Sequence, residues 1–409
     1  MSTVATTPDT KRAVAALRSP AAIRERARHL LDRARSGGSP WFAVRDDALP
    51  HAATEVAAVT RKRFPDLRIP YHSRWRHFEA GGVDRRQRLE SRLPGTEPAA
   101  RARTMIDLTV VSVLLDAGAG PDWEFHEDGR TFTRSEGLAV ASLHAFEAGL
   151  FSSDPDDPYR VDAAALRALT TDALAGAFQA GPDNPLLGLD GRAALLRRLG
   201  AALAARPDVF GPQGRPGGLF DALAAGGRLS APALLAQLLT TMAPIWPADN
   251  AIGAERLGDC WRHDAVPGPG LTAGWVPFHK LSQWLTYSLL EPFEWAGVRV
   301  EDVGALTGLP EYRNGGLLLD TGVLHLRDAA WTTRTWRPGD ELVVEWRALT
   351  VALLDDLAPL VRAELGAGAQ DLPLACILEG GTWATGRALA GRLRGGLPPL
   401  TVSSDGTVF

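Results

Sequence analysis

The stretch Val276–Trp284 places polar side chains among aromatic ones. Lys280 and Gln283 lie three residues apart, a spacing that puts both on one face of a helix. Burying such groups is costly unless they are partnered, and sites for small polar ligands are built from a few polar groups converging in an apolar cleft. We therefore expect Lys280 and Gln283 to contact a ligand, with Phe278 and Trp284 as stacking surfaces.

The stretch Leu306–Arg313 ends in a carboxylate, a phenol and a guanidinium. Glu311, Tyr312 and Arg313 are predicted in a turn between two helices, and rigid scaffolds often present functional groups on such turns. They are candidate site residues. The alternative is a purely structural ion pair between Lys280 and Glu311.

A third stretch, Tyr71–Glu79, interleaves arginines and histidines with aromatic residues. Guanidinium groups bind phosphate or carboxylate through paired hydrogen bonds. Arg74 and Arg76, with His72 and His77, therefore suit a planar, anionic ligand. The alternative is an exposed basic loop that its aromatic residues anchor to the core.

Two aspartates are further candidates for acid–base chemistry. Asp249 and Asp259 are suited to act as a general base or to stabilise a cationic centre. Each also has a structural alternative, since Asp249 could cap a turn and Asp259 could lie on a solvated helix face.

Two glycines near the carboxyl end precede a predicted helix. Gly380 and Gly381 would leave backbone N–H groups free at the positive end of the helix dipole, and Arg387 follows shortly after. This segment is a candidate phosphate site. It is not a P-loop, because no Gly-Lys-Ser/Thr follows.

Several familiar catalytic motifs do not occur in the sequence. It has no His-Glu-x-x-His, no Gly-x-Ser-x-Gly and no Gly-x-Gly-x-x-Gly after a predicted strand. The nine histidines are scattered, and His72, His77, His263 and His279 could share a metal only through tertiary structure. We predict neither a metal nor a cofactor.

Composition is typical of a globular enzyme. The 409 residues are 45% hydrophobic and 22% charged, with a net charge of −4, which argues against a dedicated nucleic-acid binder. No apolar run reaches the roughly 18 residues that span a bilayer, and the first ten residues lack the apolar core of a signal peptide. We expect a cytoplasmic protein with no nucleic-acid or membrane partner; an oligomer stays open.

Periodicity predicts a mainly helical protein with a minor β element. Apolar residues at helical spacing predict a helix over 277–290 that packs under the turn at 307–313. Other predicted helices cover 52–63, 104–115, 136–149, 161–179, 191–205, 218–225, 231–242, 300–306, 315–323 and 340–365.

Local signals fix several boundaries. Ser19 and Pro20 predict the start of a helix that Gly37 stops, and Asp128-Gly129 predicts a hairpin turn. We expect residues 1–18 to form a disordered tail and the approach to the first helix. A turn cluster near residue 152 divides an N-terminal lobe, 19–151, from a helical C-terminal lobe, 152–409, that carries most of the site.

Four sequence segments, called phrases below, together resemble the uracil-catabolism protein four family, long described as a domain of unknown function. The phrases are residues 69–78, 276–284, 309–315 and 380–387, and the resemblance covers nearly the whole chain. That family is tied to a pyrimidine degradation route. Uracil is converted to its ribonucleotide, the ring is opened, and urea and a three-carbon acid are formed.

A fainter similarity is to the nucleotide N-glycosylases of queuosine salvage. The phrases similar in order and spacing are 278–283, 306–307, 311–313, 322–324 and 345–348. Those helical proteins are related in fold to helix-hairpin-helix DNA glycosylases, so the resemblance implies such a fold here. They cleave a base from a ribose 5′-phosphate with carboxylates. This chain departs from them at Glu311, which replaces Asp, at Asn314-Gly315, which replaces Pro-Gln, and in an extra loop at 263–274; these changes bear on base specificity more than on reaction class.

Together the two resemblances imply an N-glycosylase-type hydrolase of uracil catabolism. Its substrate would be a phosphorylated ribosyl compound, a ring-opened uridine nucleotide such as ribosylurea 5′-phosphate, and urea would be released. A carboxylate would stabilise an oxocarbenium-like centre and orient water. Asp259 is the first choice, Glu311 the second and Asp249 the third.

The same resemblances imply how the rest of the substrate is held. Lys280, Arg313 and Arg74 or Arg76 would bind the 5′-phosphate, and Gln283 or Tyr312 would hydrogen-bond the urea group.

Two other classes of function stay open. One is a metal-dependent amide or ring hydrolase that uses the four histidines, and the other is a non-catalytic nucleotide-binding component of the pathway. DNA glycosylase activity is disfavoured by the acidic chain.

Overall fold

The computed structural model describes residues 7–93, 97–246 and 250–403. Helices dominate this part of the chain, and its strands form six separate two-stranded pairs. The predicted mainly α class with a minor β element is therefore confirmed. The likeness to helix-hairpin-helix glycosylases stays a prediction.

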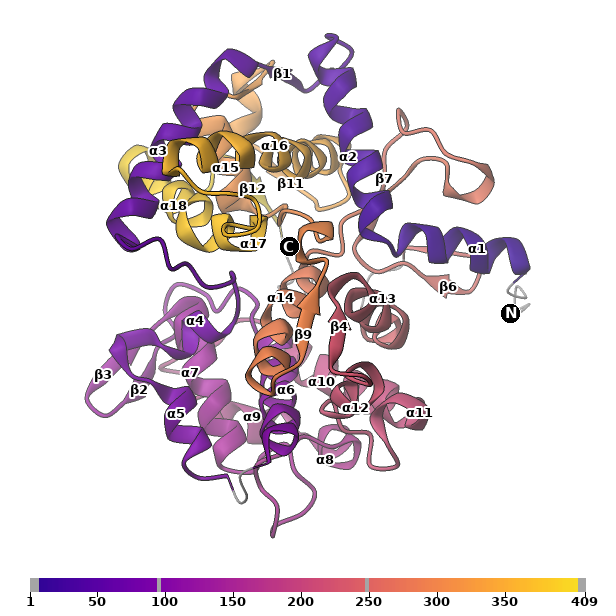
Figure 1. Cartoon of the computed structure of the whole chain (residues 1–409), viewed down its shortest axis with the longest axis vertical. Helices are drawn as coiled ribbons and strands as arrows, with labels where there is room; N and C mark the ends of the chain where they lie inside the picture. Colours follow the sequence, from indigo (N-terminus) through magenta and orange to yellow (C-terminus); the bar gives the residue numbers. More distant parts are fainter. Residues whose placement is uncertain (1–6, 94–96, 247–249, 404–409) are drawn as a thin grey trace.

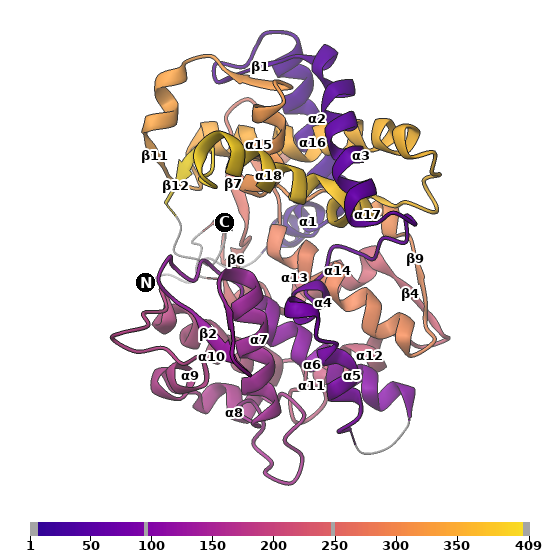
Figure 2. The same ribbon diagram turned by 90° about the vertical axis from the view of Figure 1, so that its left-hand side faces the viewer.

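Two groups of helices lie one above the other, and the separation persists after a quarter turn (Figures 1 and 2). The upper group draws on both ends of the chain. It contains α2 (Pro20–Arg35), α3 (Leu49–Arg63), α15 (Tyr312–Asp320), α16 (Glu341–Leu365), α17 (Leu374–Ile377) and α18 (Trp383–Arg394). Within it, α16 packs against α2 and α3, and α15 packs against α18.

The lower group is drawn from the middle of the chain (Figure 1). It contains α4 (Trp75–Phe78), α5 (Arg85–Glu90), α6 (Pro98–Leu114), α7 (Arg134–Glu147), α8 (Ala163–Ala168), α9 (Thr171–Ala177), α10 (Leu189–Ala204), α11 (Pro207–Phe210) and α12 (Gly218–Leu223). The packing of the two groups therefore runs across the predicted lobe boundary near residue 152, because α2 and α3 sit with the C-terminal helices.

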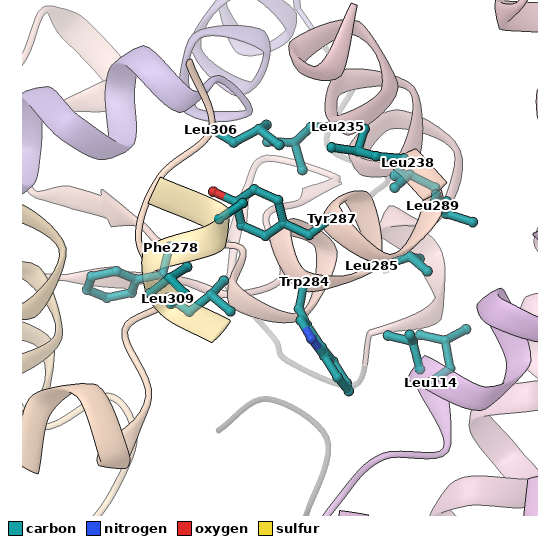
Figure 3. Close-up of a cluster of buried hydrophobic side chains, with 14 of the residues drawn as sticks. Leu114, Leu235, Leu238, Phe278, Trp284, Leu285, Tyr287, Leu289, Leu306 and Leu309 are labelled. Atoms are coloured by element: carbon teal, nitrogen blue, oxygen red, sulfur yellow. The ribbon is translucent and has the colours of Figure 1, made fainter. Parts of the chain in front are cut away.

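Helix α14 (Lys280–Trp295) lies between the groups and packs against α6 and α13 (Ala231–Thr241). Its apolar side chains meet leucines from several other segments, as Figure 3 shows around Trp284 and Tyr287. The Tyr287 hydroxyl donates to the Thr307 carbonyl at 2.8 Å, and Gln283 Nε2 donates to Thr307 Oγ1 at 2.8 Å. These bonds confirm that the helix packs under the 307–313 turn.

The strands are short and pair locally or at the ends of loops. Antiparallel pairs are β1 (Phe42–Val44) with β10 (Leu324–Leu326), β2 (Phe125–Glu127) with β3 (Arg130–Phe132), β5 (Ala251–Ile252) with β6 (Glu255–Arg256), and β7 (Cys260–Arg262) with β8 (Trp275–Pro277). Parallel pairs are β4 (Arg228–Ser230) with β9 (Arg299–Glu301) and β11 (Thr335–Trp336) with β12 (Thr401–Val402). The β7–β8 pair brings residue 259 beside the start of α14.

Several predicted boundaries are confirmed by their local chemistry. Ser19 Oγ accepts from the Ala22 N–H at 3.2 Å, so α2 begins where the cap predicted, and Gly37 follows its end at a φ of 82°. Asp128 and Gly129 take φ values of 48° and 74° in the turn between β2 and β3. Such positive values match the mirror-image turns that hairpins favour.

Other predictions are wrong. Residues 8–17 form α1 (Pro8–Leu17) instead of a disordered tail, because Thr7 caps the helix and Val14 and Leu17 bury themselves in a small apolar cluster. The predicted helix over 300–306 is β9 followed by a 3-10 turn, η5 (Val303–Ala305), and the one over 161–179 is divided into α8 and α9. Helix α14 begins at residue 280 because Pro277 pairs with Cys260 in β8.

The glycine pair near the carboxyl end does not begin a helix. Gly380 and Gly381 lie inside a π-helical segment, η7 (Leu378–Thr382), that joins α17 to α18 without a break. Their N–H groups are therefore not at a helix start, and the predicted phosphate site there is wrong. A Cβ on Gly381 would lie 2.7 Å from the Val56 carbonyl oxygen, so the glycine serves the close approach of α3.

None of the helices in the described ranges is both long and apolar enough to cross a membrane.

Candidate functional site

A cleft of about 950 Å³ opens between the upper and lower helix groups. Its walls come from the end of α3, α4, the β3 strand, the start of α7, η7 and α18. The lining residues are Arg63, His72, Arg76, His77, Ala80, Gly81, Thr131, Phe132, Thr133, Arg134, Glu136, Glu379, Trp383, Ala384 and Arg387. Four arginines against two glutamates make this an electropositive cleft suited to an anion.

His72 is one of two histidines on the cleft wall. Its Nδ1 lies 2.8 Å from Glu379 Oε2, and Arg63 donates to Glu379 Oε1 at 2.8 Å. Burial opposes ionisation of Glu379, but the hydrogen bond and charge of His72 and the charge of Arg63 outweigh it, so the pKa of Glu379 is lowered. The carboxylate is therefore ionised and accepts the Nδ1 hydrogen.

His77 is the other, and its hydrogen bond has the opposite sense. Arg74 Nη1 lies 3.3 Å from His77 Nδ1, and a guanidinium can only donate, so Nδ1 accepts and Nε2 carries the hydrogen. Burial and the Arg74 charge lower the pKa of His77 to about 4. His77 is thus a neutral hydrogen-bond donor toward the cleft.

The guanidinium of Arg74 is held by the protein and does not face a ligand. It donates to Ser112 Oγ at 2.7 Å and to the Ser135 carbonyl at 3.1 Å, and it pairs with Asp116 at 2.9 Å. Arg76, in turn, pairs with Glu291 at 2.9 Å. Arg74 therefore acts as an internal support of the site.

Trp284 joins the cleft to the buried start of α14. Its ring lies 6.4 Å from the His72 ring and 5.7 Å from the His77 ring, centroid to centroid. Its Nε1 is buried and has no hydrogen-bond partner in the described part of the chain. Gln283 Oε1, on the preceding residue of the helix, is also buried and unpaired, although Gln283 Nε2 donates to Thr307.

Lys280 and Glu311 lie close enough for each charge to influence the other. Burial lowers the pKa of Lys280 and raises the pKa of Glu311, and each is partly compensated by the other's charge. No ion pair within 4.0 Å joins these two described residues, so the structural ion pair considered above is not formed. Glu311 caps α15, accepting from the N–H groups of Arg313 and Asn314 at 2.6 Å each.

Asp259 is close to Lys280 but is engaged on both oxygens. Arg347 donates to them at 2.7 and 2.8 Å, the Lys280 backbone N–H donates at 2.9 Å, and Trp261 Nε1 donates at 2.8 Å. Burial opposes its ionisation, but the charge and hydrogen bonds of Arg347 prevail, and the pKa of Asp259 falls to about 2. This carboxylate has little capacity left for a ligand.

The remaining predicted residues are more scattered. The Arg347 guanidinium covers the ring of Phe278 at 4.1 Å, so that ring supports the ion pair and does not offer a stacking face. Arg313 is buried and donates to the Gly396 carbonyl at 3.1 Å, whereas Tyr312 is exposed beside it. Asp249 lies outside the described residues.

The four histidines considered for a metal do not come together. His263 Nε2 lies 3.0 Å from Glu345, and His279 Nε2 donates to the Leu17 carbonyl at 3.0 Å, both away from the cleft. Among the described residues, no three His, Cys, Asp or Glu side chains are arranged to hold a metal ion.

Sequence reasoning missed several residues of the site. Asp116 and Arg134 carried no motif, because each stands alone in the chain and reaches the site only through folding. Arg347 lay inside a segment used for a resemblance, residues 345–348, and Glu379 directly preceded another, residues 380–387, so a charged residue in or next to such a segment was the available signal.

Comparison with known proteins gives three matches. A family described as "Protein of unknown function (DUF1688)" matches residues 16–409. Protein urg3 of Schizosaccharomyces pombe is 42% identical over 405 residues, covering 97% of this chain and 99% of its own. Uracil catabolism protein 4 of Lachancea kluyveri is 40% identical over 377 residues, covering 83% of this chain and 85% of its own. The chain therefore belongs to the DUF1688 family and is related over most of its length to urg3 and uracil catabolism protein 4, as its four segments predicted.

Proposed function

We propose that this protein acts in uracil catabolism and hydrolyses the N-glycosidic bond of a ring-opened uridine nucleotide, with ribosylurea 5′-phosphate as the substrate that fits best. The name of one relative, uracil catabolism protein 4, supports the pathway. The chemistry at the start of α14 supports the reaction.

Two unpaired polar atoms on adjacent residues carry the proposal. Gln283 Oε1 is an acceptor and Trp284 Nε1–H is a donor, and both are buried without a partner among the described residues. Leaving such a group unsatisfied costs about 1–3 kcal/mol, which a ligand can recover. A ureido group offers N–H donors and a carbonyl acceptor, the complement of these two atoms.

Glu311 takes the role of the catalytic carboxylate in this proposal. As the bond from C1′ to the ureido nitrogen lengthens, positive charge develops on the ribose, and an ionised carboxylate in a buried site stabilises it. The Lys280 ammonium, whose pKa burial lowers, gives a proton to the departing nitrogen. Asp259 positions Lys280 through its backbone N–H and through the Arg347 pair.

The 5′-phosphate belongs in the electropositive cleft. Arg74 and Arg76 are engaged by protein groups, so we assign the phosphate to Arg134 and Arg387 on the cleft wall. Arg387 is about half exposed, and its hydrogen bond to Glu136 is long, at 3.4 Å. Arg313 stays a candidate for the same anion, whereas Lys280, first considered for it, is assigned to the departing nitrogen.

The test is incubation of the protein with ribosylurea 5′-phosphate, followed by assays for urea and ribose 5-phosphate. Glu311→Gln keeps an oxygen to cap α15 but removes the charge, so we expect kcat to fall about a hundredfold, roughly 3 kcal/mol, with KM little changed. Glu364→Gln, an exposed carboxylate on α16, is the matched control and should keep full turnover.

Two results would contradict the proposal. One is a wild-type protein that releases no urea from this substrate, and the other is full turnover by Glu311→Gln. Binding of ribosylurea 5′-phosphate without turnover would favour the non-catalytic nucleotide-binding alternative.

A further inference from the structure

The histidine–carboxylate pair of the cleft is placed to move a proton. We propose that His72 is the proton acceptor of the cleft and that Glu379 is the residue that positions it. When the ring is neutral, the hydrogen bond from Nδ1 to Glu379, at 2.8 Å, leaves its lone pair on Nε2. The ring lines the cleft, and its one side-chain hydrogen bond in the described ranges is the bond at Nδ1, so Nε2 has no protein partner there.

Neighbouring side chains hold both His72 and Glu379 in place. Arg63 holds the second oxygen of Glu379 at 2.8 Å and also donates to the carbonyls of Glu379 and Gly380. The His72 ring contacts two indoles, with its centroid 6.4 Å from the ring of Trp284 and 6.4 Å from that of Trp383. The imidazole therefore has a defined orientation toward the cleft.

The second cleft histidine cannot take this role. Arg74 donates to Nδ1 of His77, so the outward nitrogen of His77 already carries a hydrogen. The two histidines thus present opposite functions to a ligand, His72 an acceptor and His77 a donor.

A second histidine–glutamate–arginine arrangement elsewhere in the chain provides a contrast. His144 Nε2 lies 2.7 Å from Glu127, which Arg85 also binds. This arrangement does not line the cleft, and its histidine gives the outer ring nitrogen, Nε2, to the carboxylate. His144 is therefore a matched structural control for His72.

The charges around His72 come from several elements. Those that line the same cleft or act on the pair are Arg63 of α3, Arg76 and His77 of α4, Arg134 and Glu136 of α7, Glu379 of η7, Arg387 of α18 and Glu311 at the cap of α15. Glu311, the carboxylate of the proposed hydrolysis, is near enough for the charge of His72 to act on it.

The inference rests on the proposed function for the substrate and the reaction; in that reaction the proton donor is the attacking water. Nε2 takes one proton from the water as the water oxygen bonds to C1′. The C1′–N bond breaks, its electron pair leaves with urea, and the urea nitrogen takes a proton from the Lys280 ammonium. The imidazolium then returns its proton through solvent, and Lys280 regains one, so the products are ribose 5-phosphate and urea.

The activity arm uses His72→Ala and Glu379→Gln with ribosylurea 5′-phosphate. We expect each to lower kcat a hundredfold or more, with KM little changed, as loss of general-base catalysis does. Added imidazole should restore part of the His72→Ala rate. In the His72→Ala background, Glu379→Gln should lower kcat little further, because the two residues act as a unit. His144→Ala should keep its rate and show no response to imidazole.

The second arm needs no turnover. Diethyl pyrocarbonate acylates an unprotonated imidazole lone pair, and mass spectrometry of peptides gives the rate at each histidine. We expect His72 to be acylated, to be protected by ribose 5-phosphate, and to react several times more slowly in Glu379→Gln. The rate at His144 should not change in either case.

The outcomes separate the two proposals. Glu379-dependent acylation of His72 in a protein that releases no urea would overturn the substrate and keep the proton acceptor. Two results would contradict the assignment of His72 as the proton acceptor. One is urea release by His72→Ala at the wild-type rate, and the other is a rate of His72 acylation that neither Glu379→Gln nor ribose 5-phosphate changes.

Discussion

Asp259 accepts four hydrogen bonds from protein groups, two of them from the buried guanidinium of Arg347. A carboxylate so engaged is an anchor for the start of α14. Asp259 lies next to a candidate site residue, because its Oδ2 accepts from the backbone N–H of Lys280. The proposed catalytic role passes to Glu311, whose charge is less compensated.

We predict that Asp259→Asn mainly costs stability. Removing one partner of a buried ion pair leaves the other charge uncompensated, at a cost of about 3–5 kcal/mol. Urea unfolding of the variant measures this loss. The matched control is Asp221→Asn, which breaks an equally bidentate but exposed pair with Arg103 and should cost less than about 1 kcal/mol. Equal losses in the two variants would show that the Arg347 pair is not special.

The same residue predicts a pH dependence. The folded pKa of Asp259, about 2, lies below the value of about 3.9 in an unfolded chain. Its contribution to stability is therefore fully present above pH 4 and is lost as the pH falls toward 2. In acid titrations of unfolding free energy, Asp259→Asn should have a flatter curve than the wild type between pH 4 and 2. Parallel curves would contradict the lowered pKa.

At the scale of elements, the contact between α15 and α18 depends on one glycine. A Cβ on Gly386 would lie 2.8 Å from the carbonyl carbon of Arg313, which is backbone and cannot move aside. We predict that Gly386→Ala lowers the free energy of unfolding by about 1–3 kcal/mol, the usual range for overpacking.

Gly391 on the same helix is the control. A Cβ there meets nothing within 4 Å, so Gly391→Ala should raise stability by about 0.5–1 kcal/mol through helix propensity. Thermal unfolding of the two variants would give shifts of opposite sign. A shift of the same sign in both would mean that α15 and α18 are not packed as closely as described.

Elements with strong local chemistry could be predicted from the sequence. Ser19-Pro20 and Asp128-Gly129 fix a helix start and a turn because the signals lie within a few residues of the structure they set. The Gly380-Gly381 pair misled because glycine marks both helix ends and close packing, and only the position of Val56 on α3 tells the two apart.

The site itself could be predicted only in part. Lys280, Gln283, Trp284 and Glu311 stand in two phrases that the fold brings together, and the turn bonds to α14 as expected. Other residues depend on partners far away in sequence. Arg74 was predicted to contact a ligand, but its guanidinium binds Asp116 and Ser112 instead. Sequence periodicity carries no information about such long-range pairs.

At the scale of the whole molecule, the cleft is bounded by both helix groups, so a ligand that fills it should hold them together. We predict that ribose 5-phosphate raises the unfolding temperature, by an amount equivalent to about 2.7 kcal/mol at a hundred times its dissociation constant. Arg134→Ala combined with Arg387→Ala should remove most of this shift, because both line the cleft.

The control for that prediction is Arg12→Ala, an exposed arginine on α1, which should leave the shift intact. The shift in the wild type should also shrink with added salt, since it depends on charge. A shift that survives the double variant would place the phosphate elsewhere, and Arg313 would be the next residue to change.

The joining of α2 and α3 to α16 has a consequence for how the protein is made. Arg24 of α2 pairs with Asp355 of α16, which is synthesised 331 residues later. At about 5–20 residues per second, the two earlier helices wait roughly 15 to 65 s with their apolar faces uncovered, while the middle of the chain can already fold. We expect stalled nascent chains that end before α16 to be cleaved by protease within α2 and α3 and to recruit chaperones there, and chains that include α16 beyond the ribosome exit to be protected.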